Sequence, residues 1–115
     1  MKNEPKKSIL DDLFSEDELV RQGQMFGYPA YYVGRTMFAC LYEGKIGLKV
    51  PEEIANEARA MSEITDFRPH GKPKMREWIQ FDFHTEKELN LHKNLITSAL
   101  QYAKSRTNKV KGNKS

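Results

Sequence analysis

The stretch from Met25 to Glu53 constrains the fold of this chain more than any other part, because it holds three short β-like runs between turn residues. Gly34 and the Glu43-Gly44 pair separate the runs, and glycine accepts the positive φ that tight hairpin turns require. These spacings predict an antiparallel meander whose strands cover residues 28–33, 35–42 and 45–50.

The alternation of apolar and polar residues indicates which side of each strand is buried. Residues 45–50 alternate as a half-buried strand should, and the same pattern predicts a further strand at 75–83. Because side chains alternate between the two faces of a strand, Trp78 is then expected on the face of the sheet opposite Ile79 and Phe81. The apolar sets are Ile46, Leu48 and Val50 in the first strand, and Met75, Ile79, Phe81 and Phe83 in the second.

Three helices are predicted around these strands. Apolar residues recur at helical spacing over 9–14, with Ser8 as the candidate N-cap. Pro51 and the two acids after it indicate the start of a helix of about three turns. Thr85 and Glu88 form a capping box for one long final helix. The order helix, strands, helix, strand, helix predicts an α+β domain, an antiparallel sheet with helices packed on one face.

The remaining segments are harder to assign. Residues 15–24 fit a turn, a second helical start or an entry into the sheet, and all three readings stay open. At 115 residues the chain fits a single domain, which we place at 1–105. Residues 106–115 are expected to form a basic, flexible tail, because so polar a segment cannot bury enough apolar surface to offset its ordering entropy.

Several functional classes find no support in the sequence. No apolar run approaches the roughly 18 residues of a membrane helix, and no apolar segment follows the basic start, so we expect a cytoplasmic protein without membrane contact. The lone Cys40 fits a reducing compartment. His70, His84 and His92 lack metal-site spacing, and no phosphate-binding glycine loop occurs. We predict no cofactor, metal, small-molecule substrate or enzyme activity.

Two blocks of short motifs follow one another at characteristic spacing. The first holds MFG at 25–27, Gly34, MFA at 37–39 and LKVPEE at 48–53, and the second holds FRP at 67–69, Gly71, KPKMREW at 72–78 and YAKS at 102–105. In this order they resemble the TfoX/Sxy amino-terminal domain family over nearly the whole chain, with YjbR/MmcQ-like proteins as the second choice of kin. The resemblance implies an α+β fold with helices over an antiparallel sheet and no known enzyme activity. The family was first known from regulators of bacterial natural competence, which carry a second domain after this one.

A basic loop is the best functional candidate. Two prolines and a glycine within 67–76 forbid a regular element, and this segment carries four fixed positive charges without an acid between them. Such a loop can hold phosphates or an acidic partner surface, or it can be a solvated connection. Its basic residues are Arg68, His70, Lys72, Lys74 and Arg76.

Trp78 and Lys49 complete the predicted site on the outward face of the sheet. A tryptophan there requires a cover, which a partner or the chain's own terminal segments would supply. Aromatic and basic residues together suit protein interfaces and nucleobase stacking alike. We predict a small, non-enzymatic, regulatory module that binds proteins, self-association included. The alternative is a nucleic-acid-binding module that uses loop 68–76 and the basic tail.

Overall fold

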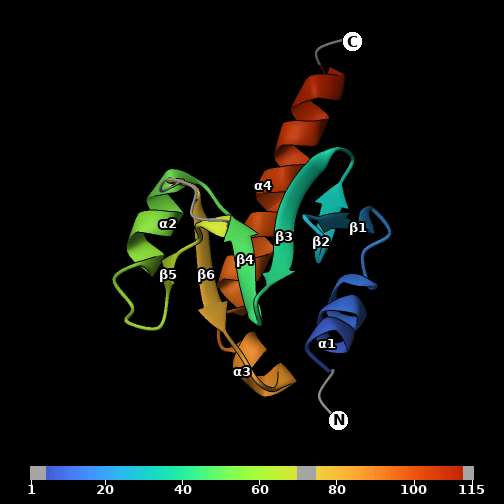
Figure 1. Ribbon diagram of the computed structural model, residues 1–115. Helices are drawn as coiled ribbons and strands as arrows, with labels where there is room; N and C mark the ends of the chain where they lie inside the picture. The colour runs from blue at the N-terminus through green and yellow to red at the C-terminus, as the bar shows by residue number, and fades with distance from the viewer. Residues whose placement is uncertain (1–4, 70–74, 113–115) are drawn as a thin grey trace.

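The computed structural model describes the backbone of residues 5–69 and 75–112 and the side chains of residues 6–69 and 75–106 (Figure 1). In chain order the elements are α1 (Pro5–Phe14), β1 (Val20–Met25), β2 (Tyr28–Val33), β3 (Thr36–Tyr42), β4 (Lys45–Lys49), α2 (Glu52–Ala58), β5 (Thr65–Asp66), β6 (Trp78–Asp82), α3 (Glu86–Asn90) and α4 (Lys93–Gly112). The predicted α+β class with an antiparallel sheet is confirmed.

The six strands form one antiparallel sheet in the order β1-β2-β3-β4-β6-β5. The β1–β2 turn at Phe26-Gly27 and the β3–β4 turn at Glu43-Gly44 have positive φ at both central residues. This geometry matches the right-handed twist of the flanking strands. The meander is therefore as predicted, and β1 extends it into the segment that the sequence left open. The two-residue β5 was not predicted.

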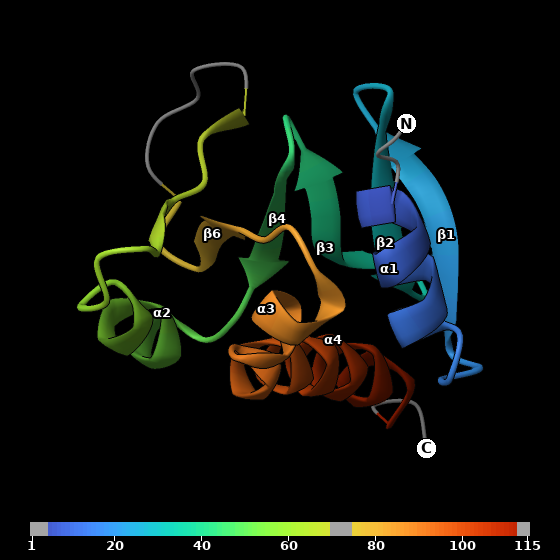
Figure 2. The same cartoon turned by 90° about the horizontal axis from the view of Figure 1, so that it is seen from below.

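Helices cover one face of the sheet, here called the helical face. In Figure 2, α3 and α4 lie on the same side of the strands. The core on this face is aliphatic and aromatic, and the alternating residues of β4 and β6 point into it as predicted. Its strand residues include Tyr31, Val33, Ile46, Leu48, Ile79, Phe81 and Phe83, and its helical residues include Leu10, Phe14, Ala55, Leu89, Ile96 and Ala99.

Two polar contacts anchor helices to this face. The Tyr31 hydroxyl donates to Asp11 of α1 at 2.7 Å, and burial together with this carboxylate raises the pKa of Tyr31. Lys104 of α4 donates to Asp17 at 2.6 Å, and this hydrogen bond lowers the pKa of Asp17. The first contact ties α1 to β2, and the second ties α4 to the connection between α1 and β1.

The helices differ from their predicted bounds. Helix α1 begins at Pro5, so Ser8 lies inside it and is not its N-cap. Helix α2 ends at Ala58 because the backbone then closes shorter turns, with Met61 N–H donating to the Ala58 carbonyl at 2.9 Å.

The predicted long final helix is divided in two. The Thr85 hydroxyl accepts from Glu88 N–H at 3.1 Å, so the predicted start is confirmed. The helix then breaks at Leu91 and His92, whose N–H groups donate only three residues back. The His92 ring packs on Phe81 at 4.5 Å between centroids, which fixes the chain at this break.

The C-terminal helix passes the predicted domain boundary. Helix α4 continues to Gly112 and projects beyond the strands (Figure 1). Flexibility of residues 106–115 stays a prediction. None of the helices described within 5–69 and 75–112 is long and apolar enough to cross a membrane.

Candidate interaction surface

The face of the sheet opposite the helices, here called the open face, carries a row of small residues. The strand register aligns Gly23 with Ala30, Ala30 with Cys40, and Cys40 with Gly47. Phe67, which follows β5, lies on this row. A Cβ at Gly47 would be 3.0 Å from Phe67 Cδ1 and 3.1 Å from Cys40 Sγ, so only glycine leaves room for the ring.

An aromatic row crosses the same face. The ring centroids of Tyr28 and Tyr42 are 4.6 Å apart, those of Tyr42 and Phe67 are 5.7 Å apart, and those of Phe67 and Trp78 are 5.2 Å apart. Phe67 is only 1% exposed and forms the centre of this row. Tyr32 also lies on the open face, whereas Tyr31 belongs to the helical core.

Trp78 lies on the open face as predicted and is half-buried. Phe67 and Met75 lie in the same cluster, and the ring centroids of Phe67 and Trp78 are 5.2 Å apart, whereas further cover by the terminal segments or by a partner stays a prediction. Met75 was also predicted on the face of Ile79, but it packs in the cluster of Trp78. The reason is that β6 begins only at Trp78, after a turn in which Trp78 N–H donates to the Met75 carbonyl at 3.1 Å. Period two therefore does not extend back to Met75.

Beside Trp78 the open face contains an apolar depression of about 200 Å³, here called the methionine hollow. Phe26 stands at its rim with 55% of its surface exposed and a φ of 53°. A bulky residue in this left-handed conformation is an outlier, because glycine, asparagine and aspartate are the residues that such turns favour. The hollow is lined by Met25, Phe26, Met37, Phe67, Pro69, Met75 and Trp78.

The three described cations of the predicted site each face an acid. Arg68 lies 3.3 Å from Asp66, Arg76 lies 3.7 Å from Glu52, and Lys49, opposite Trp78 on the neighbouring strand, lies 4.0 Å from Glu77. His70, Lys72 and Lys74 fall outside the described residues. Among the described residues, the predicted site is therefore a set of partly exposed ion pairs around an apolar centre.

Arg59, at the end of α2, positions this surface and was missed by sequence reasoning. Its Nε lies 2.7 Å from Asp66, and its Nη2 donates to the carbonyls of Arg76 at 3.0 Å and Trp78 at 3.3 Å. One guanidinium thus ties α2 to β5 and to the start of β6. Its partners are distant in sequence, so no local pattern could have indicated this role.

A second anchor ties the start of β6 to α4. The Tyr102 hydroxyl donates to the Glu77 carboxylate at 2.6 Å, and this hydrogen bond raises the pKa of Tyr102. The backbone of Glu77 also accepts from Val50 N–H at 2.9 Å. Trp78 therefore follows a residue that is held by both a helix and the neighbouring strand.

The open face does not activate its only thiol. Cys40 is fully buried beneath Phe67, and burial raises its pKa to about 12. The thiol is therefore protonated at neutral pH and is a poor nucleophile. Within the described part of the chain, no group of three or more His, Cys, Asp or Glu side chains is placed to hold a metal ion.

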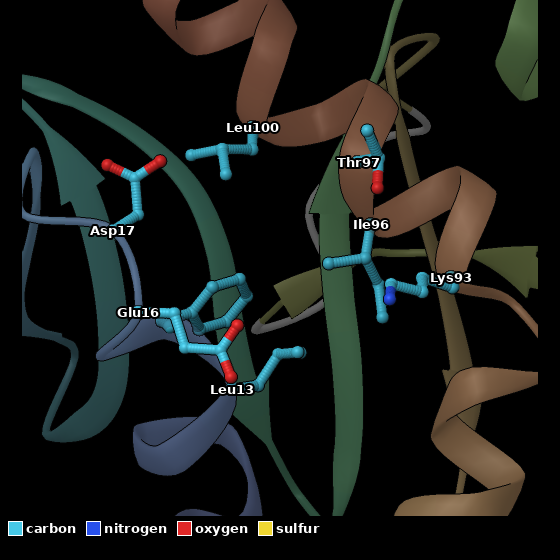
Figure 3. Close-up of a pocket in the computed structure, with 8 residues that line it drawn as sticks. Leu13, Glu16, Asp17, Lys93, Ile96, Thr97 and Leu100 are labelled. Carbon is cyan, nitrogen blue, oxygen red and sulfur yellow. The ribbon is translucent and has the colours of Figure 1, made fainter.

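A second apolar groove of about 240 Å³ lies between α1 and α4. Leu13 and Ile96 extend into the space between the two helices (Figure 3). Glu16 and Asp17 border it on the side of α1, and Lys93 on the side of α4. The groove is continuous with the helical core, because Phe14 and Ile96 belong to both.

Comparison of the chain with protein-family models, with curated proteins and with solved structures gives no match.

Proposed function

We propose that this protein is a small non-enzymatic module with a regulatory role in the cytoplasm, and that it acts through protein contacts made by its open face. The observation that carries the proposal is the methionine hollow beside Trp78, with the exposed aromatic ring of Phe26 at its rim. Tryptophan, aromatic residues, methionine and arginine are the residue types enriched at protein interfaces, and all of them occur around this hollow.

The regulatory part of the proposal follows the resemblance to TfoX/Sxy amino-terminal domains. The non-enzymatic part is supported by the buried, protonated Cys40 thiol. Self-association through the same face is a form of the same function. In each case the contact would cover an apolar surface that the helices leave open.

Affinity capture from the native cytoplasm tests this function. Wild-type protein is compared with Trp78→Ala, and Leu91→Ala serves as the matched control because Leu91 is 76% exposed and lies far from the hollow, between α3 and α4. Circular dichroism establishes that each variant is folded. We expect Trp78→Ala to lose a partner that the control retains. A strict monomer in sedimentation, with every partner retained by Trp78→Ala, would contradict the proposal.

Nucleic-acid binding is the second candidate, and the four fixed positive charges between Arg68 and Arg76 favour it. It predicts an affinity for DNA that falls steeply with salt and drops when Lys72, Lys74 and Arg76 are replaced by glutamine. Absence of binding to duplex and single-stranded DNA at low salt would eliminate this candidate.

A further inference from the structure

The lining of the methionine hollow suits a bulky, apolar side chain. Three of its residues, Met25, Met37 and Met75, have unbranched, polarisable side chains that adapt to differently shaped groups. Phenylalanine, proline and tryptophan provide the rest of the lining, and none of the lining side chains is charged. The hollow therefore offers dispersion contacts and desolvation to an apolar group.

Phe26 is a separate observation that points to binding at this site. The β1–β2 turn requires positive φ at both of its central residues, and an asparagine would satisfy the first position with less strain than Phe26. The chain instead places an aromatic ring there with more than half of its surface exposed. Backbone strain of this kind is concentrated at functional sites, where the side chain has a use that offsets the strain.

Two arginines that neighbour lining residues in the sequence indicate the chemistry of the occupant. Arg68 immediately precedes Pro69, and Arg76 immediately follows Met75. The Arg68 side chain itself lines a separate polar pocket together with Asp66 and Gln80. The side chains of Arg68 and Arg76 are 51% and 77% exposed, and exposed ion pairs contribute little to stability. Carboxylates of a partner can therefore replace Asp66 and Glu52 as the contacts of the two arginines, because breaking the existing ion pairs costs little free energy.

A nucleic acid fits the hollow less well. Base stacking needs an open aromatic face. Trp78, however, is packed against Phe67 at 5.2 Å, and Phe67 itself is buried.

We infer that the methionine hollow binds a short acidic segment of a partner protein, which inserts a bulky apolar side chain between Met37, Met75 and Trp78 and directs its carboxylates to Arg68 and Arg76. The inference rests on the proposed function and specifies the chemistry of the partner.

Methyl NMR on the full chain tests this inference. The signals are the labelled methionine methyls and the Trp78 indole N–H, and the probe is a synthetic peptide with a central Leu-Phe pair between runs of Asp and Glu. One control peptide has Lys in place of each acid, and the other has Ser in place of Leu and Phe. We expect the acidic apolar peptide to shift the signals of Met25, Met37, Met75 and Trp78. Both controls should bind at least about tenfold more weakly, since each lacks one of the two interactions.

Variants show whether the shifts report binding at the hollow. Phe26→Asn should lower the affinity for the acidic peptide severalfold. It should not lower the unfolding midpoint, because asparagine accepts the left-handed conformation. Replacing both Arg68 and Arg76 by glutamine should lower the affinity for the acidic peptide and make that affinity less dependent on salt. Leu91→Ala should leave the affinity unchanged.

Three results would overturn the inference. The first is the absence of shifts at a millimolar concentration of the acidic peptide, and the second is equal or tighter binding of the basic peptide. The third is a shift of the same methyl signals without the peptide. Such a shift on concentrating the protein alone would identify a second copy as the occupant, and on adding oligothymidine it would identify a nucleic acid. Loss of a cellular partner by Trp78→Ala without any peptide binding would reject this inference and leave the proposed function standing. Retention of all partners by Trp78→Ala, together with a strict monomer in sedimentation, would reject the proposed function itself.

Discussion

The two faces of the sheet are covered in different ways. On the helical face, residues from all four helices form one continuous core with the strands. On the open face, the cover comes from a single segment, which places Phe67 on Gly47 and leaves the methionine hollow beside it. The same strands supply both faces because successive side chains point in opposite directions. This difference indicates that the helical face provides most of the stability, and it underlies the proposal that the open face binds a partner.

The side chains reflect this division. Aliphatic residues and phenylalanines dominate the strand positions of the helical core. The open face instead has glycine, alanine and cysteine in its central row, with tyrosines, methionines and Trp78 around them. Small central residues allow the sheet to accept a ring on its surface. Methionine and the aromatic residues then surround that ring with adaptable contacts.

The largest expected effect is on the helical face. Phe81 is 1% exposed and packs against His92, so Phe81→Ala should lower the free energy of unfolding by about 3–5 kcal/mol. Denaturant titration followed by circular dichroism measures this change. A loss smaller than that of the open-face variant in the next prediction would contradict the division between the faces.

A smaller loss of stability is expected on the open face. In Gly47→Ala the new methyl group would lie closer to Phe67 and Cys40 than van der Waals contact allows. We expect the free energy of unfolding to fall by about 1–3 kcal/mol. Displacement of Phe67 should also change the fluorescence of Trp78, the only tryptophan of the chain. Unchanged stability and fluorescence would mean that Phe67 is not seated on Gly47.

The smallest expected effect concerns an anchor of the helical face. Asp17→Asn removes the contact with Lys104, in which both side chains are partly exposed, so the loss should be about 0.5–1 kcal/mol at pH 7. The pKa of Asp17 is lower in the folded protein than its ordinary value of 3.8. The contribution is therefore complete at neutral pH and disappears as the pH falls through the folded pKa. Unfolding curves of both proteins at several pH values should converge in acid, and a constant difference would exclude this ion pair as the cause.

Sequence periodicity predicted the parts of the molecule that depend on local pattern. The alternation in β4 and β6 identified the helical face, and the glycine turns identified the meander. The Thr85–Glu88 capping box marked the start of α3. Each of these features depends on neighbouring residues, which is why a single sequence sufficed.

The open face depends on contacts between distant segments, and here the sequence was insufficient. Phe67 lies in a stretch without periodicity, and only its contact with Gly47 reveals it as the cover of the sheet. Arg59 likewise acts on groups that are seven to nineteen residues away. One signal was present in the sequence, because a phenylalanine before Gly27 is unusual for a tight turn.

The most direct test of the division measures stability and binding on the same two variants. Phe81→Leu changes the helical face by a mild volume reduction, and Phe26→Asn changes the rim of the methionine hollow. Each variant is assayed by denaturant unfolding and by titration with the acidic apolar peptide under conditions in which it is fully folded. We predict that Phe81→Leu loses stability and keeps its affinity, whereas Phe26→Asn keeps its stability and loses affinity. Parallel changes of stability and affinity in both variants would contradict the account.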